Sequence, residues 1–140
     1  MLVLDIGCGS KKTKGSIGID ITQSGGVDIV HDVNKGLPMI DSNSVDRIHC
    51  YHSLEHLKDV ECVMKELYRI LKNKGKIFIR VPHFSSRIAH DIHHKVFFCS
   101  LSFDYLDRDT WIGQYDHSER PCFKIIKKKI TLYSSVEILR

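Results

Sequence analysis

The stretch that decides the fold is residues 2–9, Leu-Val-Leu-Asp-Ile-Gly-Cys-Gly, near the amino terminus. The apolar residues up to Ile6 are typical of a short buried strand, and Gly7 and Gly9 predict a tight turn directly after it. Glycines at such a turn allow the backbone to approach a ligand closely. A dinucleotide-binding turn would need a third glycine at position 12, where this chain has Lys12. A nicotinamide or flavin site is therefore disfavoured.

Further short apolar runs predict more strands, and one longer stretch predicts a helix. The expected strands cover residues 16–21, 27–31, 45–50, 76–81 and 123–133. Between Ser53 and Lys74, apolar residues recur every three or four positions, which is typical of an amphipathic helix. Ser53 is expected to cap the start of this helix, and Gly75 is expected to take the left-handed conformation after its end. A helix that leads into a strand is typical of a crossover in a parallel sheet, so the sequence predicts an α/β fold.

Length and composition narrow the class of protein. The chain has 140 residues, which favours one domain over residues 1–140. Its net charge is +4 and its only dense basic run is Lys127–Lys129, so nucleic acid is disfavoured as a partner. No apolar run approaches the roughly 20 residues that span a membrane, and the start lacks the pattern of a signal peptide. We therefore expect no membrane association and a cytoplasmic location.

The five cysteines are scattered without a CxxC pair, which disfavours disulfides and a thiolate zinc site.

Two acidic residues follow the second and third predicted strands. Asp20 ends the run from Ile17, and Asp32 comes just after the run over residues 27–31. The carboxyl ends of neighbouring parallel strands line one crevice, in which ligands bind. A carboxylate at Asp20 can accept hydrogen bonds from the two adjacent hydroxyls of a ribose, and one at Asp32 can accept from an exocyclic amine such as that of adenine. A turn or helix-cap role is the alternative for each residue.

The motifs, taken in order, resemble the signature of class I S-adenosylmethionine-dependent methyltransferases, in particular the small-molecule-type group. They are Leu4–Gly9 (LDIGCG), Gly18–Asp20, His31–Asp32, Ser44–Ile48, Leu54–Leu57 (LEHL) and Leu71–Gly75. The resemblance runs from residue 2 to about residue 82. It implies a three-layer Rossmann-like fold with a mostly parallel sheet. It also implies transfer of the methyl group of S-adenosylmethionine to a small-molecule or macromolecular acceptor, with S-adenosylhomocysteine as the other product.

The resemblance also implies residues that hold the methionine and ribose portions of the cofactor. Asp5, Gly7 and Gly9 would line these portions. Asp20 would hold the ribose hydroxyls, and its neighbour Ile21 would contribute to the same site.

A second set of residues would face the adenine and the methyl group. Asp32 would meet the adenine amine, and Val33 would pack on the ring. Tyr51 would face the methyl group and the substrate. His52 is the candidate base for a hydroxyl or amine acceptor, because an imidazole titrates near neutral pH. Methyl transfer from a sulfonium often needs little beyond alignment, so a base is not obligatory.

The chain departs from this family pattern in two places. Residues 10–16 leave little room for a helix between the first two strands, which predicts a more open cofactor site. After the strand expected at residues 123–133, only residues 136–139 remain for another strand. We therefore expect a sheet that is minimal or truncated at its C-terminal edge, or one that is completed by a homodimer.

Two other functions stay open. One is a degenerate or partner-dependent module that binds S-adenosylmethionine without activity alone. The other is a metal-dependent hydrolase built on His83, His90, His93 and His94, in which His90 and His94 would share one face of a helix. The methyltransferase interpretation assigns no metal ligands.

Overall fold

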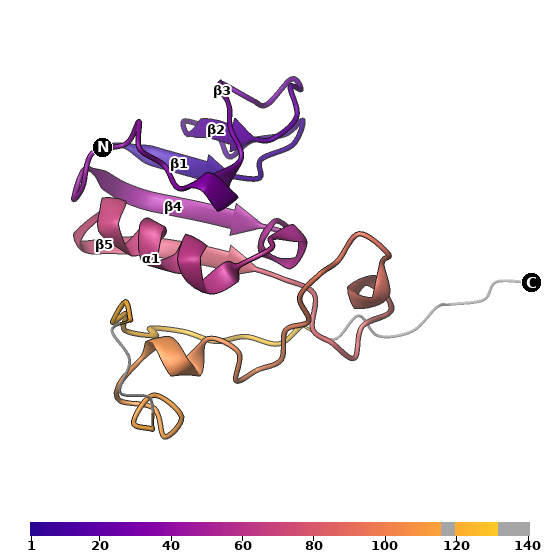
Figure 1. Ribbon diagram of the computed structural model, residues 1–140, viewed down its shortest axis with the longest axis vertical. Helices are drawn as coiled ribbons and strands as arrows, with labels where there is room; N and C mark the ends of the chain where they lie inside the picture. Colours follow the sequence, from indigo (N-terminus) through magenta and orange to yellow (C-terminus); the bar gives the residue numbers. More distant parts are fainter. Residues whose placement is uncertain (116–119, 132–140) are drawn as a thin grey trace, which may run out of the picture.

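Five parallel strands form the centre of the fold (Figure 1). The computed structural model describes residues 1–115 and 120–131. The strands are β1 (Val3–Ile6), β2 (Ile17–Asp20), β3 (Ile29–Val30), β4 (Val45–Tyr51) and β5 (Leu71–Arg80). Their order in the sheet is β3-β2-β1-β4-β5, and every pairing is parallel. The order reverses between β1 and β4, which confirms the predicted α/β, Rossmann-like arrangement and places a switch point at the carboxyl end of β1.

The helix before β5 is shorter than the sequence predicts. Helix α1 spans Val60–Ile70, and Asp59 caps it by accepting a hydrogen bond from Cys62 N at 2.9 Å. The prediction of Ser53 as its cap is wrong, because residues Leu54–His56 form a separate 3₁₀ turn, η2, and Ser53 makes no capping bond there. The prediction for Gly75 is also wrong, since the left-handed residue after the helix is Lys74, with φ of 64°.

One face of the sheet packs against α1. Strand register places Leu4, Ile6, Ile19, Ile48 and Cys50 on this face. They form a single buried cluster with the apolar side of the helix, contributed by Val63, Met64, Leu67 and Ile70. Burial of these apolar side chains is the main source of stability for a domain of this kind.

The other face of the sheet is covered by loops at β1 and β2 and is exposed at β4 and β5. Asp5 lies on this face, and its Oδ2 accepts a hydrogen bond from Thr13 N at 2.6 Å, which holds the loop over residues 10–16 across β1. Across β4 and β5, register pairs Arg47 with Lys76 and His49 with Phe78. Among the described residues, α1 is the only α-helix, and it lies on the opposite face.

The segment after β5 packs beside α1 and β5 with little regular structure (Figure 1). Its only helical turns among the described residues are η3 (Arg87–His90) and η4 (Asp104–Leu106). A further turn, η1 (Val33–Lys35), lies before β4. The strand predicted at residues 123–133 is wrong over its described part, residues 123–131, which form no strand. Instead, Phe123 packs edge-on against Tyr68 of α1, with ring centroids 5.1 Å apart. Residues 136–139 lie outside the described residues.

Candidate functional site

The glycine turn after β1 packs directly against the segment that follows β4. Gly7 and Gly9 both have positive φ, at 67° and 54°, in the region that favours glycine. A Cβ atom on Gly7 would lie 2.3 Å from Cβ of Ser53, so no larger residue fits there. At Gly9, a Cβ atom would meet nothing within 4 Å, so the turn faces open space at this point. The sequence did not reveal the contact with Ser53, because it joins residues 46 positions apart.

Asp20 lies at the end of β2 and joins the two neighbouring strand ends. Its Oδ2 accepts a hydrogen bond from Gly9 N at 2.9 Å, and its Oδ1 accepts one from Thr22 N at 3.1 Å. The carboxylate remains partly exposed, and the next side chain, Ile21, is 65% exposed. The structure therefore brings Gly9, Asp20 and Ile21 together at the carboxyl ends of β1 and β2.

Asp32 follows β3 and caps the 3₁₀ turn η1, so its alternative interpretation as a cap is correct for its local geometry. Its Oδ1 accepts hydrogen bonds from the side chain and the backbone of Asn34, at 2.8 and 3.0 Å, and these bonds lower the pKa of the carboxyl. Val33 packs partly against the core. Asn34 also accepts from Lys58 N at 3.0 Å, which ties the end of β3 to the segment after η2.

Asp28 is a residue that the sequence analysis missed. Its carboxylate accepts from Gly18 N at 2.7 Å and pairs with Lys12, and the Lys12 side chain is the main cause of its lowered pKa. Gly18 is closed in by backbone, since a Cβ atom there would lie 2.2 Å from the carbonyl oxygen of Gly26. The loops over residues 10–16 and 24–28 thus interlock where a longer family member has room for a helix. No periodicity marks Asp28, because its role depends on where the two loops meet.

Asp5 and Cys8 lie beneath the glycine turn. Asp5 is only 3% exposed, so its carboxylate shapes the loop through Thr13. Burial raises the pKa of the Cys8 thiol, and the nearby charges of Asp20 and Asp5 raise it further. The thiol therefore stays protonated at neutral pH and donates to the carbonyl of Gly26 at 3.4 Å.

The end of β4 presents Tyr51 and His52. The Tyr51 hydroxyl lies 2.9 Å from Nδ1 of His49, and the guanidinium of Arg80 lies 5.2 Å from its ring centre. His52 has a φ of 55°, which is unusual for a residue with a side chain and is typical of functional positions. Its imidazole is exposed, and Nδ1 lies 3.5 Å from Oε1 of the buried Glu55. The sequence alone gives no signal for this contact between His52 and Glu55.

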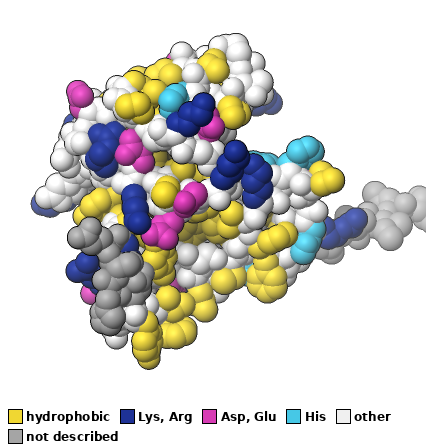
Figure 2. Space-filling model, in the orientation of Figure 1, with side chains coloured by type: hydrophobic (Ala, Val, Ile, Leu, Met, Phe, Trp, Pro, Cys, Tyr) yellow, Lys and Arg dark blue, Asp and Glu magenta, His cyan; other side chains and the backbone are white. Residues whose placement is uncertain are grey.

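The histidine cluster is dispersed in the structure. The predicted helix through His90 and His94 is wrong, because η3 ends at His90. His83 bonds to Ser85, and His93 pairs with Asp91, so both are engaged on their own loop. His90 stacks beside Phe97. Figure 2 shows several histidine side chains on the side of the molecule that carries η3, and another in the upper part near the strands β1–β3.

A family model described as a methyltransferase domain matches residues 4–79, which covers more than half of the chain. The chain therefore belongs to the methyltransferase domain family. The match begins in β1 and ends in β5, so it covers nearly all of the parallel sheet and the whole glycine turn. This agrees with the resemblance to class I S-adenosylmethionine-dependent methyltransferases.

One solved structure supports this fold, and two others are similar over a smaller part of the chain. A SAM-dependent methyltransferase from Archaeoglobus fulgidus is 24% identical over 74% of this chain and 57% of that one, with a TM-score of 0.61. The YcgJ protein from Bacillus subtilis is 27% identical over 54% of this chain and 41% of its own, with a TM-score of 0.44. A complex between the Haloferax volcanii Trm112 methyltransferase activator and a methyltransferase matches at 22% identity, 54% and 42% coverage and a TM-score of 0.42.

The chain spans 41–57% of the length of these solved chains. No curated protein matches it significantly. Among the described residues, no helix is long and apolar enough to cross a membrane.

Proposed function

We propose that the chain binds S-adenosylmethionine at the carboxyl ends of β1 and β2 and transfers its methyl group to an acceptor. The observation that carries this proposal is the carboxylate of Asp20, held beside the glycine turn by the bond from Gly9 and still partly exposed. An exposed carboxylate at a strand end suits the two hydroxyls of a ribose. The family match supports this use of the site.

The residues around Asp20 fit the remaining parts of this cofactor. Gly9 faces open space that a side chain would otherwise fill, which leaves room for a ligand against the backbone. Ile21 offers an exposed apolar side chain that can cover an adenine ring, and Asp32 lies beyond it at the end of β3 for the adenine amine. Val33, next to Asp32, packs partly against the core on the same side of the proposed adenine site. Asp5 contributes by shaping the loop, because its own carboxylate is buried.

S-adenosylmethionine, when held by these residues, would supply an activated methyl group to an acceptor nucleophile. The task of the chain is then to align the two partners and to exclude water. Tyr51 and His52 lie at the end of β4, next to the glycine turn through Ser53. The exposed imidazole of His52 is placed to accept the proton of a hydroxyl or amine acceptor.

A second candidate is a cofactor-binding module that another segment or a partner completes. The observation in its favour is the exposed sheet face at β4 and β5, together with the 57% coverage of the Archaeoglobus fulgidus chain. Cofactor binding without turnover by the isolated chain, restored when a partner is added, would favour this function over a self-sufficient enzyme.

Calorimetric titration with S-adenosylhomocysteine tests the proposal. We expect one site per chain, and an Asp20→Ala variant that binds about tenfold or more weakly, because it loses charge-assisted hydrogen bonds. Asp41→Ala is the matched control, since Asp41 is exposed on the loop before β4, at the amino ends of the strands, and should leave affinity unchanged. Absence of binding to the folded chain, or equal affinity in Asp20→Ala, would refute the assignment.

A further inference from the structure

A group of metal-ligating side chains lies outside the cofactor site. Glu55 and His56 come from η2, directly after β4, and His94 comes from the loop after η3. One ligand atom from each of the three residues lies within 4.8 Å of those of the other two. The three residues combine two imidazoles with one carboxylate, a donor set typical of zinc and other divalent transition metals.

The Glu55 carboxylate lacks the partners that its burial requires. Its side chain is only 1% exposed, and Oε1 faces His52 at 3.5 Å. Oε2 is buried and has no hydrogen-bond partner among the residues that the structure describes. A buried carboxylate oxygen without a donor is costly, and a positively charged ligand removes that cost.

The two histidines are oriented as metal ligands usually are. Nδ1 of His56 lies 3.3 Å from the carbonyl oxygen of His93, and Nδ1 of His94 lies 3.2 Å from that of Ala89. An Nδ1–H that donates to a backbone carbonyl fixes the tautomer and leaves the lone pair on Nε2. The two rings meet edge-on with centroids 4.7 Å apart. Each imidazole therefore keeps Nε2 free of these backbone contacts.

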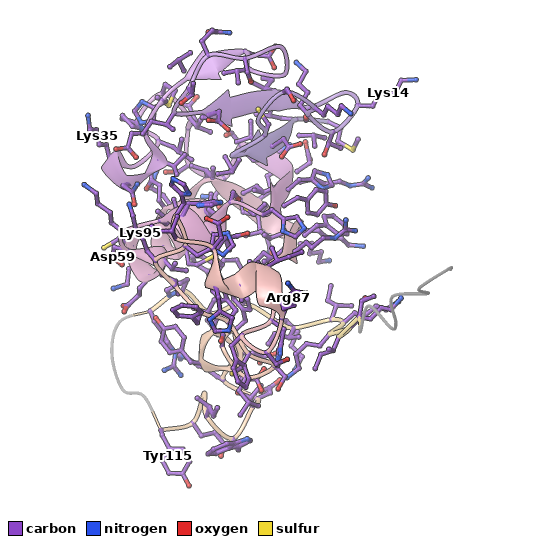
Figure 3. The ribbon with its side chains drawn as sticks, turned by 90° about the vertical axis from the view of Figure 1, so that its right-hand side faces the viewer. Lys14, Lys35, Asp59, Arg87, Lys95 and Tyr115 are labelled. Carbon is purple, nitrogen blue, oxygen red and sulfur yellow. The ribbon has the colours of Figure 1, made fainter. Side chains whose placement is uncertain are left out.

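The backbone holds the two segments of this group together. The carbonyl oxygen of Glu55 accepts hydrogen bonds from Lys95 N at 2.7 Å and from Val96 N at 3.2 Å. The residue after His94 is thus bonded to the residue before His56. Figure 3 shows Lys95 between the sheet and the turn that carries Arg87. The distance between the ligands is set by main-chain bonds and does not require a loop to close.

We propose that Glu55, His56 and His94 bind one divalent transition-metal ion of the zinc type. Three protein ligands leave an open coordination position, as in zinc sites that also bind water or a substrate atom. His56 is exposed, which provides an entry path, while the buried Glu55 supplies the negative charge. This set differs from the hydrolase hypothesis, because of its four histidines only His94 takes part. The proposal does not depend on methyl transfer.

Titration of the metal-free chain with Zn²⁺, followed by calorimetry, tests this site. We expect one ion per chain, and we expect His94→Gln and Glu55→Gln to bind Zn²⁺ at least about tenfold more weakly. His93→Gln is the matched control, because its side chain is exposed and points to Asp91 on the same loop. Co²⁺ in place of Zn²⁺ should give a visible absorption band in the wild type and in His93→Gln, and no such band in His94→Gln.

A second measurement separates loss of the ligand from loss of the fold. Without metal, Glu55→Gln should unfold at the same temperature as the wild type or higher, because the buried charge is gone. With Zn²⁺, only the wild type and His93→Gln should gain thermal stability. Failure of the folded wild type to bind Zn²⁺, or equal Zn²⁺ affinity in wild type and His94→Gln, would overturn the proposal, whatever the result with S-adenosylhomocysteine.

Discussion

The two faces of the sheet differ sharply, although the same strands contribute to both. One face carries Leu4, Ile48 and Cys50 and is sealed by α1. The other carries Arg47 and Phe78, and at β4 and β5 the described part of the chain leaves it open to solvent. Parallel strands that are buried on both faces usually read as continuous apolar runs. Strand β1 fits that description, whereas β4 and β5 alternate.

This difference shows that the central strand β1 is buried on both faces, whereas β4 and β5 are buried on one face only. Residues 76–80 read Lys-Ile-Phe-Ile-Arg, and every second side chain turns to the open face. There Arg47 lies directly opposite Lys76, and like charges in that position repel. We therefore expect the packed face to contribute most of the free energy of unfolding and the open face to contribute little. Three substitutions test this difference between the two faces.

The largest effect is expected from Leu67→Ala on the packed side. Leu67 is fully buried on α1, so its truncation removes apolar burial and leaves a cavity, at a cost of about 2–5 kcal/mol. Urea titration followed by circular dichroism measures the change in the free energy of unfolding. A cost below about 1 kcal/mol would mean that α1 contributes little to holding that face.

A smaller effect, dependent on pH, is expected from Glu66→Gln, next to Leu67 on the same helix. The guanidinium of Arg69 and the backbone N–H of Leu37 bind the Glu66 carboxylate, and the Arg69 side chain is the main cause of its lowered pKa. A carboxyl whose pKa is lower in the folded state stabilises the protein above its unfolded pKa of about 4.3. That stabilisation is lost as the pH falls through the folded pKa.

The substitution should therefore cost about 1–2 kcal/mol at neutral pH, where a charge-assisted hydrogen bond is lost. The difference between variant and wild type should shrink as the pH falls below about 4. Unfolding curves at a series of pH values measure it. A difference that stayed constant with pH would show that the ion pair with Arg69 does not anchor the loop over residues 37–42 to α1.

The smallest effect is expected from Phe78→Ala on the open face. Phe78 is 40% exposed and mainly stacks on His49, with ring centroids 5.1 Å apart. Its loss should cost less than about 1 kcal/mol, well below the value for Leu67→Ala. The same urea titrations check this, alongside size-exclusion chromatography. A cost comparable to that of Leu67→Ala would show that this face is covered in solution, for example by a second copy of the chain.

Much of the parallel sheet was predictable, because each strand is marked by a short apolar run in the local sequence. The run to Ile6 with its two glycines, and Asp20 at the end of the next run, lie within the first 20 residues and carry part of the family resemblance. Apolar and polar residues alternate along β4 and β5, which is typical of strands with one buried and one exposed face. The helix start was misassigned because Ser53 and Asp59 are both good capping residues, and the 3₁₀ turn between them has no distinctive pattern.

The parts that could not be predicted depend on contacts between distant segments. Asp28 matters because two loops meet over Gly18. His94 joins Glu55 because main-chain bonds place residue 95 against residue 55. Neither of these two contacts is marked by a periodic pattern in the local sequence. The segment over residues 123–131 alternates like a strand, yet it packs through Phe123 on α1 and bonds to η4 without a partner strand among the described residues.

The central position of β1 has a consequence for synthesis on the ribosome. Of the five strands it is made first, all four of its side chains are buried in the final fold, and it is bonded on both edges. Its partner on one side, β2, follows soon after, but the bonds between Leu2 and Asp46 join residues 44 positions apart. At a synthesis rate of ~5–20 residues per second, roughly two to nine seconds pass before β4 is made and can pair with that edge of β1. During that delay the unpaired edge of β1 is open to pairing with strands of other chains.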